Sequence, residues 1–146
     1  MRTWKGFAPQ SVEDYSMCFA CGQENPNGLK LRFRKEGETV KTEFTPGECH
    51  QGWPGIVHGG IIETLLDEAM CYAPFLFHGM YCVTAKIEVR IRQPVPAGQR
   101  LLISSNVVRK TRKLVETEAN IILEDGSPVA EGKATMYVVS ESKKGM

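Results

Sequence analysis

The residues best suited to chemistry lie in one stretch of the chain, residues 52–70. At its centre a His58-Gly59-Gly60 triplet marks the point where a loop rich in glycine and proline gives way to a helical pattern. Backbone N–H groups at the start of a helix have no partner inside the helix, and glycines let a ligand approach them closely. The triplet is therefore typical of a site that binds an oxyanion or polarises a carbonyl group.

An acidic residue, Asp67, follows on the same helix. It comes seven residues after Gly60, nearly two helical turns, so both residues share one face. An acidic side chain on a mostly apolar helix costs free energy unless it has a partner or a function. Asp67 is therefore the first candidate for a nucleophile or a general base, and Glu63 on the same side is the second. Glu68 faces elsewhere, and the alternative for Asp67 is a structural pair with an arginine.

The helix that carries these residues is the only long one that the sequence predicts. Apolar residues from Gly59 to about Phe77 cover more than half of its circumference, so it should be buried on most sides. Alternating patterns predict a hairpin over residues 29–44 and strands over 83–92, 101–108, 115–123 and 130–138. The order β-β-α-β-β-β-β with a buried helix indicates an α+β fold, in which about six mostly antiparallel strands curl around the helix.

A basic run connects two of the predicted strands. Lysine and arginine suit phosphate groups by their charge and by the guanidinium fork, so the run is a candidate phosphate site, with Arg90 and Arg92 as further candidates. The alternative is an exposed, charged hairpin turn. The run consists of Arg109, Lys110, Thr111, Arg112 and Lys113.

Two cysteines near the N-terminus, Cys18 and Cys21, have the spacing of half a zinc site. Cys49 and His50 are candidates for the remaining ligands, although two adjacent residues are awkward ligands for one tetrahedral ion. The alternatives are ordinary loop cysteines, or a redox CxxC motif, which is disfavoured because no βαβ pattern surrounds it.

The composition excludes several classes of protein. A length of 146 residues predicts a single domain, and the balance of 18 basic against 17 acidic residues disfavours nucleic-acid and polybasic membrane binders. No apolar stretch is long enough for a membrane span, and the first ten residues lack the apolar core of a signal peptide. Five cysteines without a secretory signal predict reduced thiols and a cytoplasmic location, with Cys71 and Cys82 as small core residues.

Three segments together resemble a known family. They are the pattern HGG-x6-D from His58 to Asp67, the run VTAKIEVRIRQPVPAG, and the last strand AEGKATMYVV. They are similar to the hotdog-fold acyl-CoA thioesterases, in particular the phenylacetyl-CoA thioesterase-like (PaaI-type) group. The resemblance implies a hotdog fold within one domain, residues 1–146. Its predicted parts are an N-terminal arm with the CxxC loop (1–27), the hotdog core (28–139) and a polar tail (140–146).

The resemblance also implies roles for the residues of the helix. The Gly60 N–H would polarise the thioester carbonyl, with Gly59 beside it. His58 would orient this loop or contact the substrate. Asp67 would act as the nucleophile or as the general base that activates water. No cofactor is implied for this reaction, so zinc at the two N-terminal cysteines would be structural.

Two features depart from the family pattern. Thr84 matches a Ser/Thr that helps to position the water in some relatives, but strict alternation places it on the polar face of its strand. A role beside the helix therefore requires a bulge in that strand or a place at a subunit boundary. Several relatives carry an Asn where this chain has Gly52, and Gln51 is the candidate to replace its polar contact. The basic run would hold the phosphates of coenzyme A.

The spacing of Gly60 and Asp67 predicts an oligomer. At 1.5 Å per residue they lie about 10 Å apart along the helix, whereas both must come within about 3 Å of the reacting group. Two helices packed antiparallel across a two-fold axis would bring Gly60 of one subunit near Asp67 of the other. We therefore expect a homodimer with two shared sites, or a dimer of dimers.

Three functions are compatible with this pattern. The first is hydrolysis of a fatty-acyl-CoA or aryl-CoA thioester, and the second is non-catalytic binding of acyl-CoA. The third is a hotdog hydratase, which is disfavoured because Tyr72 stands where a His would be expected. Four aromatic residues near the helix are either core or dimer contacts or the lining of an acyl pocket: Trp53, Phe75, Phe77 and Tyr81.

Overall fold

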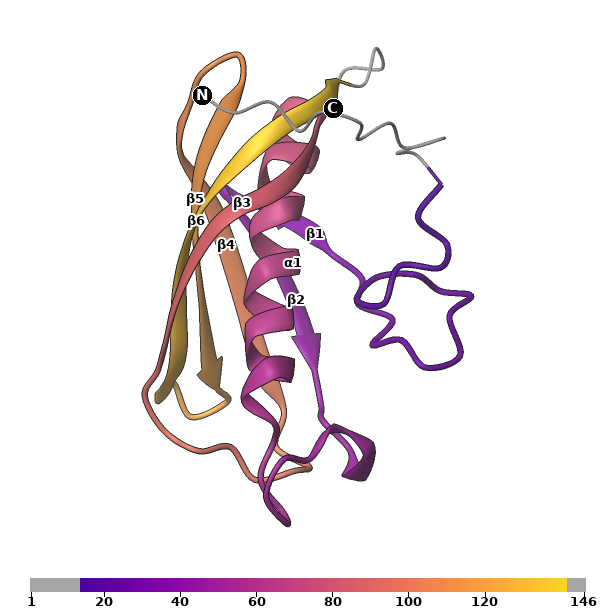
Figure 1. The fold of residues 1–146 in the computed structure, drawn as a ribbon. Helices are drawn as coiled ribbons and strands as arrows, with labels where there is room; N and C mark the ends of the chain where they lie inside the picture. Colours follow the sequence, from indigo (N-terminus) through magenta and orange to yellow (C-terminus); the bar gives the residue numbers. More distant parts are fainter. Residues whose placement is uncertain (1–13, 142–146) are drawn as a thin grey trace.

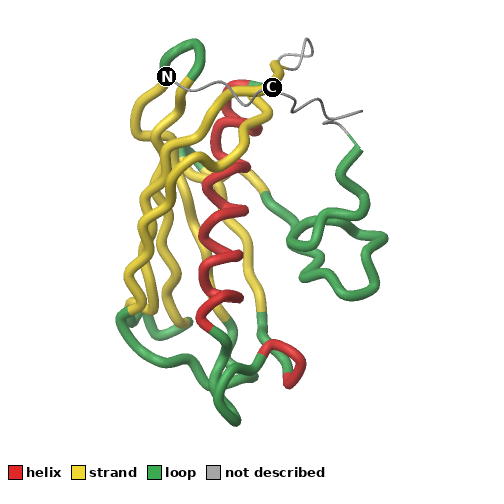
Figure 2. The backbone as a smooth tube through the Cα atoms, in the orientation of Figure 1, coloured by secondary structure: helices red, strands yellow, loops and turns green. Residues whose placement is uncertain are grey.

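A computed structural model describes residues 14–141, and Figures 1 and 2 show α1 lying along one face of a twisted sheet. The elements are β1 (Arg34–Glu36), β2 (Thr39–Phe44), a short 3-10 helix (Glu48–His50), α1 (Gly59–His78), β3 (Met80–Ile91), β4 (Leu101–Lys110), β5 (Leu114–Leu123) and β6 (Pro128–Glu141). The sheet order is β1-β2-β4-β5-β6-β3, with every neighbouring pair antiparallel. The predicted hotdog architecture is thus confirmed. The first 13 residues of the predicted arm and residues 142–146 of the tail lie outside the described residues, and β6 extends into the predicted tail.

The α1 helix starts where the sequence predicts and ends one residue later. His58 forms the N-cap in an extended conformation, and Gly79 ends the helix with a left-handed φ of 64° that favours glycine. One face of the helix packs against the sheet and forms the core. Its buried residues are Ile62, Leu65, Leu66, Ala69, Met70, Ala73 and Pro74. No helix within residues 14–141 is long and apolar enough to cross a membrane.

The first strand is shorter than the predicted hairpin because the chain before it pairs with the CxxC loop. The N–H groups of Leu29 and Leu31 donate to the carbonyls of Phe19 and Ala20, at 2.8 and 2.9 Å. Between them Lys30 has a positive φ of 55°, which interrupts the extended backbone. Both leucines are buried, so the apolar alternation was a correct signal for burial although not for a strand.

A bulge in β3 changes which residues face the helix. Thr84 and Lys86 pair with two adjacent residues of β6, so Ala85 is an extra residue in the ladder. The extra residue puts Thr84 on the same side of the strand as Ile87 and Val89, next to α1. Thr84 thus faces the helix, not the polar side that strict alternation indicated, and the structure contains the bulge that this position requires.

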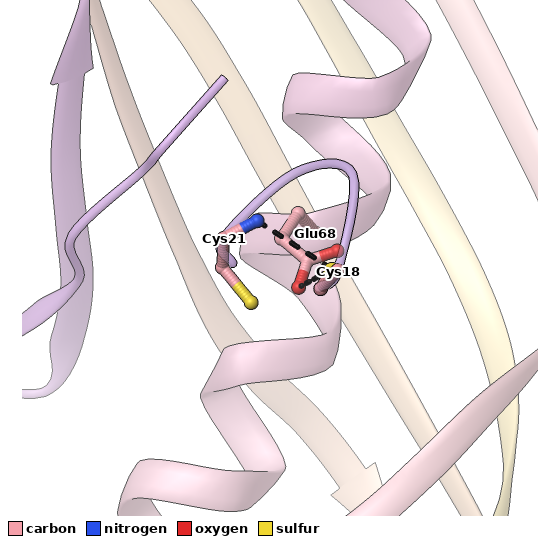
Figure 3. Close-up of side chains that lie close together, drawn as sticks. All are labelled: Cys18, Cys21 and Glu68. Carbon is pink, nitrogen blue, oxygen red and sulfur yellow. Dashed lines mark hydrogen bonds between the residues drawn. The ribbon is translucent and has the colours of Figure 1, made fainter. Parts of the chain in front are cut away.

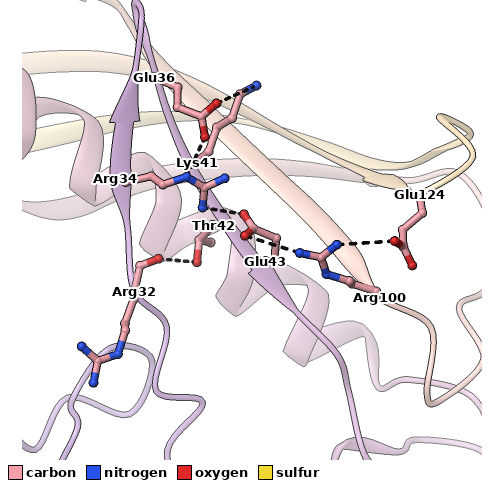
Figure 4. A network of polar contacts seen from close by, with 8 residues as sticks. All are labelled: Arg32, Arg34, Glu36, Lys41, Thr42, Glu43, Arg100 and Glu124. Atoms are coloured by element: carbon pink, nitrogen blue, oxygen red, sulfur yellow. Dashed lines mark hydrogen bonds and ion pairs between the residues drawn. The ribbon is translucent and has the colours of Figure 1, made fainter.

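The two edges of the sheet differ in length. The β1 edge is three residues long, and ion pairs join it to its neighbours (Figure 4): Arg34 lies 2.7 Å from Glu43, which lies 3.6 Å from Arg100. The β3 edge is twelve residues long, and no strand of the described chain lies beyond it. Ile87 and Ile91 on this edge are 37% and 44% exposed. Long apolar edges are usually covered in soluble proteins.

Candidate active site

An open cleft of about 330 Å³ lies between α1 and the edge strand β3. It brings together three residues that the sequence singled out, Gly60, Asp67 and Thr84. Glu63, the second acid candidate, is exposed in the same cleft. The lining consists of Gly60, Glu63, Thr64, Asp67, Thr84, Ile87 and Val89. The cleft therefore combines a helix start, two acids and a hydroxyl group against an apolar wall.

Asp67 and Thr84 form a hydrogen-bonded pair inside this cleft. The Thr84 hydroxyl donates to Asp67 Oδ1 at 2.5 Å, and both side chains are half-buried. Cys71, one turn further along α1, places its Sγ 3.8 Å from the same hydroxyl oxygen. The contact with Cys71 was not anticipated from the sequence. Because the bulge sets the direction of Thr84, it also fixes how the carboxylate of Asp67 is held.

His58 caps the start of the helix. Its Nδ1 accepts a hydrogen bond from the Gly60 N–H at 2.8 Å, and a Cβ at position 60 would lie 3.0 Å from that nitrogen. A substrate carbonyl would therefore have to replace the imidazole as the acceptor of this N–H. The N–H of Gly59 has no acceptor among residues 14–141. The hydrogen bond fixes the His58 imidazole against the first turn of α1.

The Gln51 side chain forms its hydrogen bonds within the loop before the helix. The Gln51 side chain accepts from the Gly55 N–H and donates to the Glu48 carbonyl, so it braces its own loop, and it does not line the cleft. Next to it, a Cβ on Gly52 would lie 3.2 Å from His58 Cα. Close packing against His58 therefore accounts for the glycine at the position where several relatives carry Asn.

The arginines of β3 lie apart from the cleft. Arg92, just after β3, pairs with Glu131 of β6, and this contact raises the pKa of Arg92 and lowers that of Glu131. Arg90 is exposed and, like Glu131, lies on the face of the sheet away from α1. Neither guanidinium contributes to the lining of the cleft.

The basic run comprises the last two residues of β4 and the turn before β5, at the end of the sheet where α1 ends (Figure 1). Arg109 pairs with Glu116 at 3.0 Å. The pKa of His78, the last residue of α1, is lowered first by burial and then by the charge of Lys110. The rest of the run is exposed. Eleven residues of helix separate Asp67 from this end, about 16 Å, so within one protomer the run does not adjoin the cleft.

The aromatic residues near the helix have separate environments. Phe75 and Tyr81 line a second, mostly apolar cavity of about 270 Å³, together with Tyr72. Trp53 is 84% exposed in the loop before the helix, and Phe77 lies beneath a lysine ammonium group. Cys71 lines this second cavity and contacts Thr84, so the two cavities lie on either side of that contact.

The CxxC loop meets the helix at Glu68 (Figure 3). The Sγ atoms of Cys18 and Cys21 and a Glu68 carboxylate oxygen lie within 4.8 Å of one another. Burial raises the pKa of Glu68 and of Cys21 above their ordinary values. Cys49 and His50, the ligands that the sequence suggested, contact each other at 3.5 Å and do not join this cluster. No local pattern in the sequence predicts that Cys18 and Glu68 lie close together.

Comparison with known proteins identifies the family. The family model of the thioesterase superfamily matches residues 54–130. The chain belongs to the thioesterase superfamily. The matched region begins in the loop before α1 and continues into β6, so it contains the helix and every residue of the cleft.

Two curated relatives in the superfamily are acyl-coenzyme A thioesterases THEM4. The chain is 30% identical over 96 residues to that of Xenopus laevis, covering 65% of this chain and 42% of the relative. It is 27% identical over 131 residues to that of Bos taurus, covering 76% and 54%. The chain thus spans about half the length of the relatives it matches.

Solved structures of superfamily members share the fold. Zebrafish thioesterase superfamily member 2 has a TM-score of 0.72 at 20% identity, covering 85% of this chain and 91% of that one. The Escherichia coli PaaI protein has a TM-score of 0.69 at 16% identity, with coverages of 78% and 83%. A hypothetical thioesterase protein from Streptococcus pneumoniae, crystallised with coenzyme A, has a TM-score of 0.68 at 19% identity, with coverages of 77% and 88%.

Proposed function

We propose that this protein hydrolyses the thioester of a fatty-acyl-CoA or aryl-CoA to the free acid and coenzyme A. The proposal is supported by the superfamily, by relatives that are named acyl-CoA thioesterases, and by a related fold crystallised with coenzyme A. The observation that carries it is the Asp67–Thr84 pair, which shares one open cleft with the helix start at Gly60.

The reaction follows from the groups of this cleft, with Gly60 contributed by one chain and Asp67 by a second chain. The Gly60 N–H, released from His58, donates to the thioester carbonyl and stabilises the negative charge that develops on its oxygen. In one route Asp67 takes a proton from water, whose oxygen bonds to the carbonyl carbon. The C–S bond then breaks, and the proton passes to the departing thiolate. In the other route Asp67 attacks the carbon, the C–S bond breaks and coenzyme A leaves as the thiolate. Water then hydrolyses the resulting anhydride to the free acid and the Asp67 carboxylate, and the proton released passes to the thiolate.

A single turnover in ¹⁸O-labelled water separates these two routes. The anhydride contains one carbonyl carbon from the acyl group and one from Asp67. When water attacks the carbon from Asp67, ¹⁸O remains in the Asp67 carboxylate. The general-base route leaves all of the ¹⁸O in the released acid. Mass spectrometry of the peptide that contains Asp67 reads the difference.

We also propose a homodimer, alone or as half of a dimer of dimers, in which each site combines two chains. Gly60 and Asp67 are separated by about 10 Å of helix, too far for both to reach one thioester. The long β3 edge with exposed Ile87 and Ile91 supports pairing of two sheets there, whereas the β1 edge is only three residues long. Light scattering tests this, and a purely monomeric protein at micromolar concentration would contradict it.

Replacing Asp67 tests the activity. For Asp67→Asn we expect a loss of about 10²–10⁴-fold in kcat, which is the usual contribution of a general base. Asp125→Asn, an identical change on an exposed turn far from the cleft, is the control and should keep full activity. Release of the coenzyme A thiol from a panel of acyl-chain lengths and aryl esters measures turnover. If Glu63→Gln abolished turnover and Asp67→Asn did not, Glu63 would be the base.

The same panel addresses non-catalytic binding of acyl-CoA. Calorimetric binding of an acyl-CoA without release of thiol by any ester would favour a binding protein over an enzyme. We further propose a cytoplasmic location. It is supported by five free cysteines, of which Cys49 is exposed and would be vulnerable in an oxidising compartment.

A further inference from the structure

We propose that Cys18, Cys21 and Glu68 form a structural metal site that takes Zn²⁺ or a similar divalent cation. The ligand atoms lie within 4.8 Å of one another, and Cys18 Sγ is 3.8 Å from Glu68 Oε1 (Figure 3). Tetrahedral zinc with bonds of about 2.3 Å to sulfur and about 2.1 Å to oxygen places its ligand atoms about 3.6–3.8 Å apart. The cluster is therefore close to the spacing that the ion requires.

The local backbone holds the two thiols in place. The Gly22 N–H donates to the Cys18 carbonyl at 2.8 Å and closes a tight turn. A Cβ at position 22 would lie 2.4 Å from the nitrogen of Cys18 and 2.4 Å from the carbonyl oxygen of Ser16, so this turn needs glycine. The Cys21 N–H donates to Cys18 Sγ at 3.5 Å, which fixes the position of that sulfur in the loop. The loop thus presents two sulfurs to the same helix before any ion binds.

The surroundings of Glu68 favour a bound cation. It is partly buried, and its polar contacts are with the thiols of Cys18 and Cys21. No lysine, arginine or histidine within residues 14–141 forms an ion pair with it. Buried carboxylates are normally paired with a cation or bound to a metal. Two thiolates and one carboxylate carry a charge of −3, which a divalent ion reduces to −1.

The donor set favours zinc. Thiolates select borderline or soft ions such as Zn²⁺, whereas Mg²⁺ and Ca²⁺ prefer oxygen ligands throughout. Three protein ligands leave the fourth tetrahedral position for water. Cys49 and His50 do not supply it, because they lie outside the cluster.

The site lies outside the cleft, beside the second cavity, which its three side chains help to line. Glu68 is one residue, and therefore about 100° around the helix, from Asp67, and it does not line the cleft. The ion would join the CxxC loop to the middle of α1, adding to the two hydrogen bonds by which the loop holds Leu29 and Leu31. Binding of a metal to a folded site adds directly to the stability of the fold.

Metal analysis of the purified, tag-free protein tests this inference. We expect about one zinc per chain in the wild type and in Cys49→Ser, the control for loss of a cysteine outside the site. Cys18→Ser and Cys21→Ser should lose the metal. Glu68→Gln should bind the metal at least about tenfold more weakly. Loss of only an outer hydrogen bond to a metal ligand already weakens metal binding by about 10–100-fold, and Glu68 would be a ligand itself.

Two further measurements keep the test decisive if a variant unfolds. Co²⁺ added to the metal-free wild type should give the visible bands of a tetrahedral ion and a thiolate charge-transfer band, both absent in Cys21→Ser. A chelator should lower the melting temperature of the wild type and leave that of Cys21→Ser unchanged. A wild type that takes up neither ion, or metal content retained in both cysteine variants, or a Cys18–Cys21 disulfide in the freshly purified protein, would overturn the inference.

Discussion

Replacing Thr84 with valine is the sharpest test of how the cleft is organised. Valine matches threonine in shape but has no hydroxyl, so the change removes the hydrogen bond to Asp67 Oδ1 and little else. That bond is 2.5 Å long and exists because the bulge at Ala85 turns Thr84 towards α1. We expect the carboxylate of Thr84→Val to lose its fixed orientation and catalysis to slow while the protein stays folded.

The size of the effect follows from the geometry. A hydrogen bond to a charged group contributes about 1.5–3 kcal/mol. Asp67 and Thr84 are only half-buried and border an open cleft, so water can partly replace the lost donor. The lower value, about 1.5 kcal/mol, therefore applies, and it corresponds to about a tenfold loss of kcat/KM.

Steady-state hydrolysis of an acyl-CoA, followed by thiol release, measures this effect. The loss should fall on kcat with KM nearly unchanged, because Thr84 positions the base and does not hold the substrate. Thr84→Ser keeps the hydroxyl and should restore most of the activity. An unimpaired Thr84→Val, or a Thr84→Ser that is equally slow, would refute the reasoning. Equal melting temperatures of both variants exclude a general loss of structure.

Three further predictions concern packing, charge and thiol reactivity. Gly132→Ala places a Cβ 3.1 Å from Cε of the buried Met70. Because this is the flexible end of the side chain and has to shift only slightly, we expect urea unfolding to show a loss of at most about 1 kcal/mol, the lower end of the cost of overpacking. A loss of about 3 kcal/mol or more would contradict this packing. If the basic turn binds the phosphates of coenzyme A, added salt should raise the KM for acyl-CoA by screening this attraction. Arg112→Gln should make KM less sensitive to salt. A KM that does not change with salt would exclude phosphate binding by this turn. Burial raises the pKa of Cys82 to about 12, so at pH 8 only about 10⁻⁴ of its thiol is ionised. Iodoacetamide should therefore label the exposed Cys49 before Cys82. Mass spectrometry measures the two labels, and equal labelling of Cys49 and Cys82 would contradict this prediction.

Much of the fold could be predicted because its signals are local. The helix has a clear apolar period, a loop with an N-cap before it and Gly79 after it. Spacing alone placed Gly60 and Asp67 on one face, and both line the same cleft. The strands after the helix alternate clearly enough to be found, although their ends shift by a few residues.

The bulge in β3 could not be predicted from the same alternation. Apolar and polar residues alternate without a break from Val83 to Arg92, and this pattern assigned Thr84 to the polar side. The extra residue at Ala85 shifts the register without interrupting the pattern, so the alternation carries no sign of the bulge.

Contacts between segments that are far apart in the sequence could not be predicted. Glu68 was correctly placed off the catalytic face, but nothing local shows that it meets cysteines 47 and 50 positions earlier. The partners of Gln51, Glu48 and Gly55, lie in its own loop and bind both ends of its amide, whereas its contact with a substrate stays a prediction.

The shared active site is the central claim, and mixed dimers test it most directly. Gly60→Pro removes the N–H that would polarise the carbonyl, at a first-turn position where proline is tolerated, and Asp67→Asn removes the base. Each homodimer should be inactive. A heterodimer isolated with two different tags contains one site with both Gly60 and Asp67, so we predict about half of the wild-type activity per dimer. A heterodimer as inactive as its two parents would contradict the account.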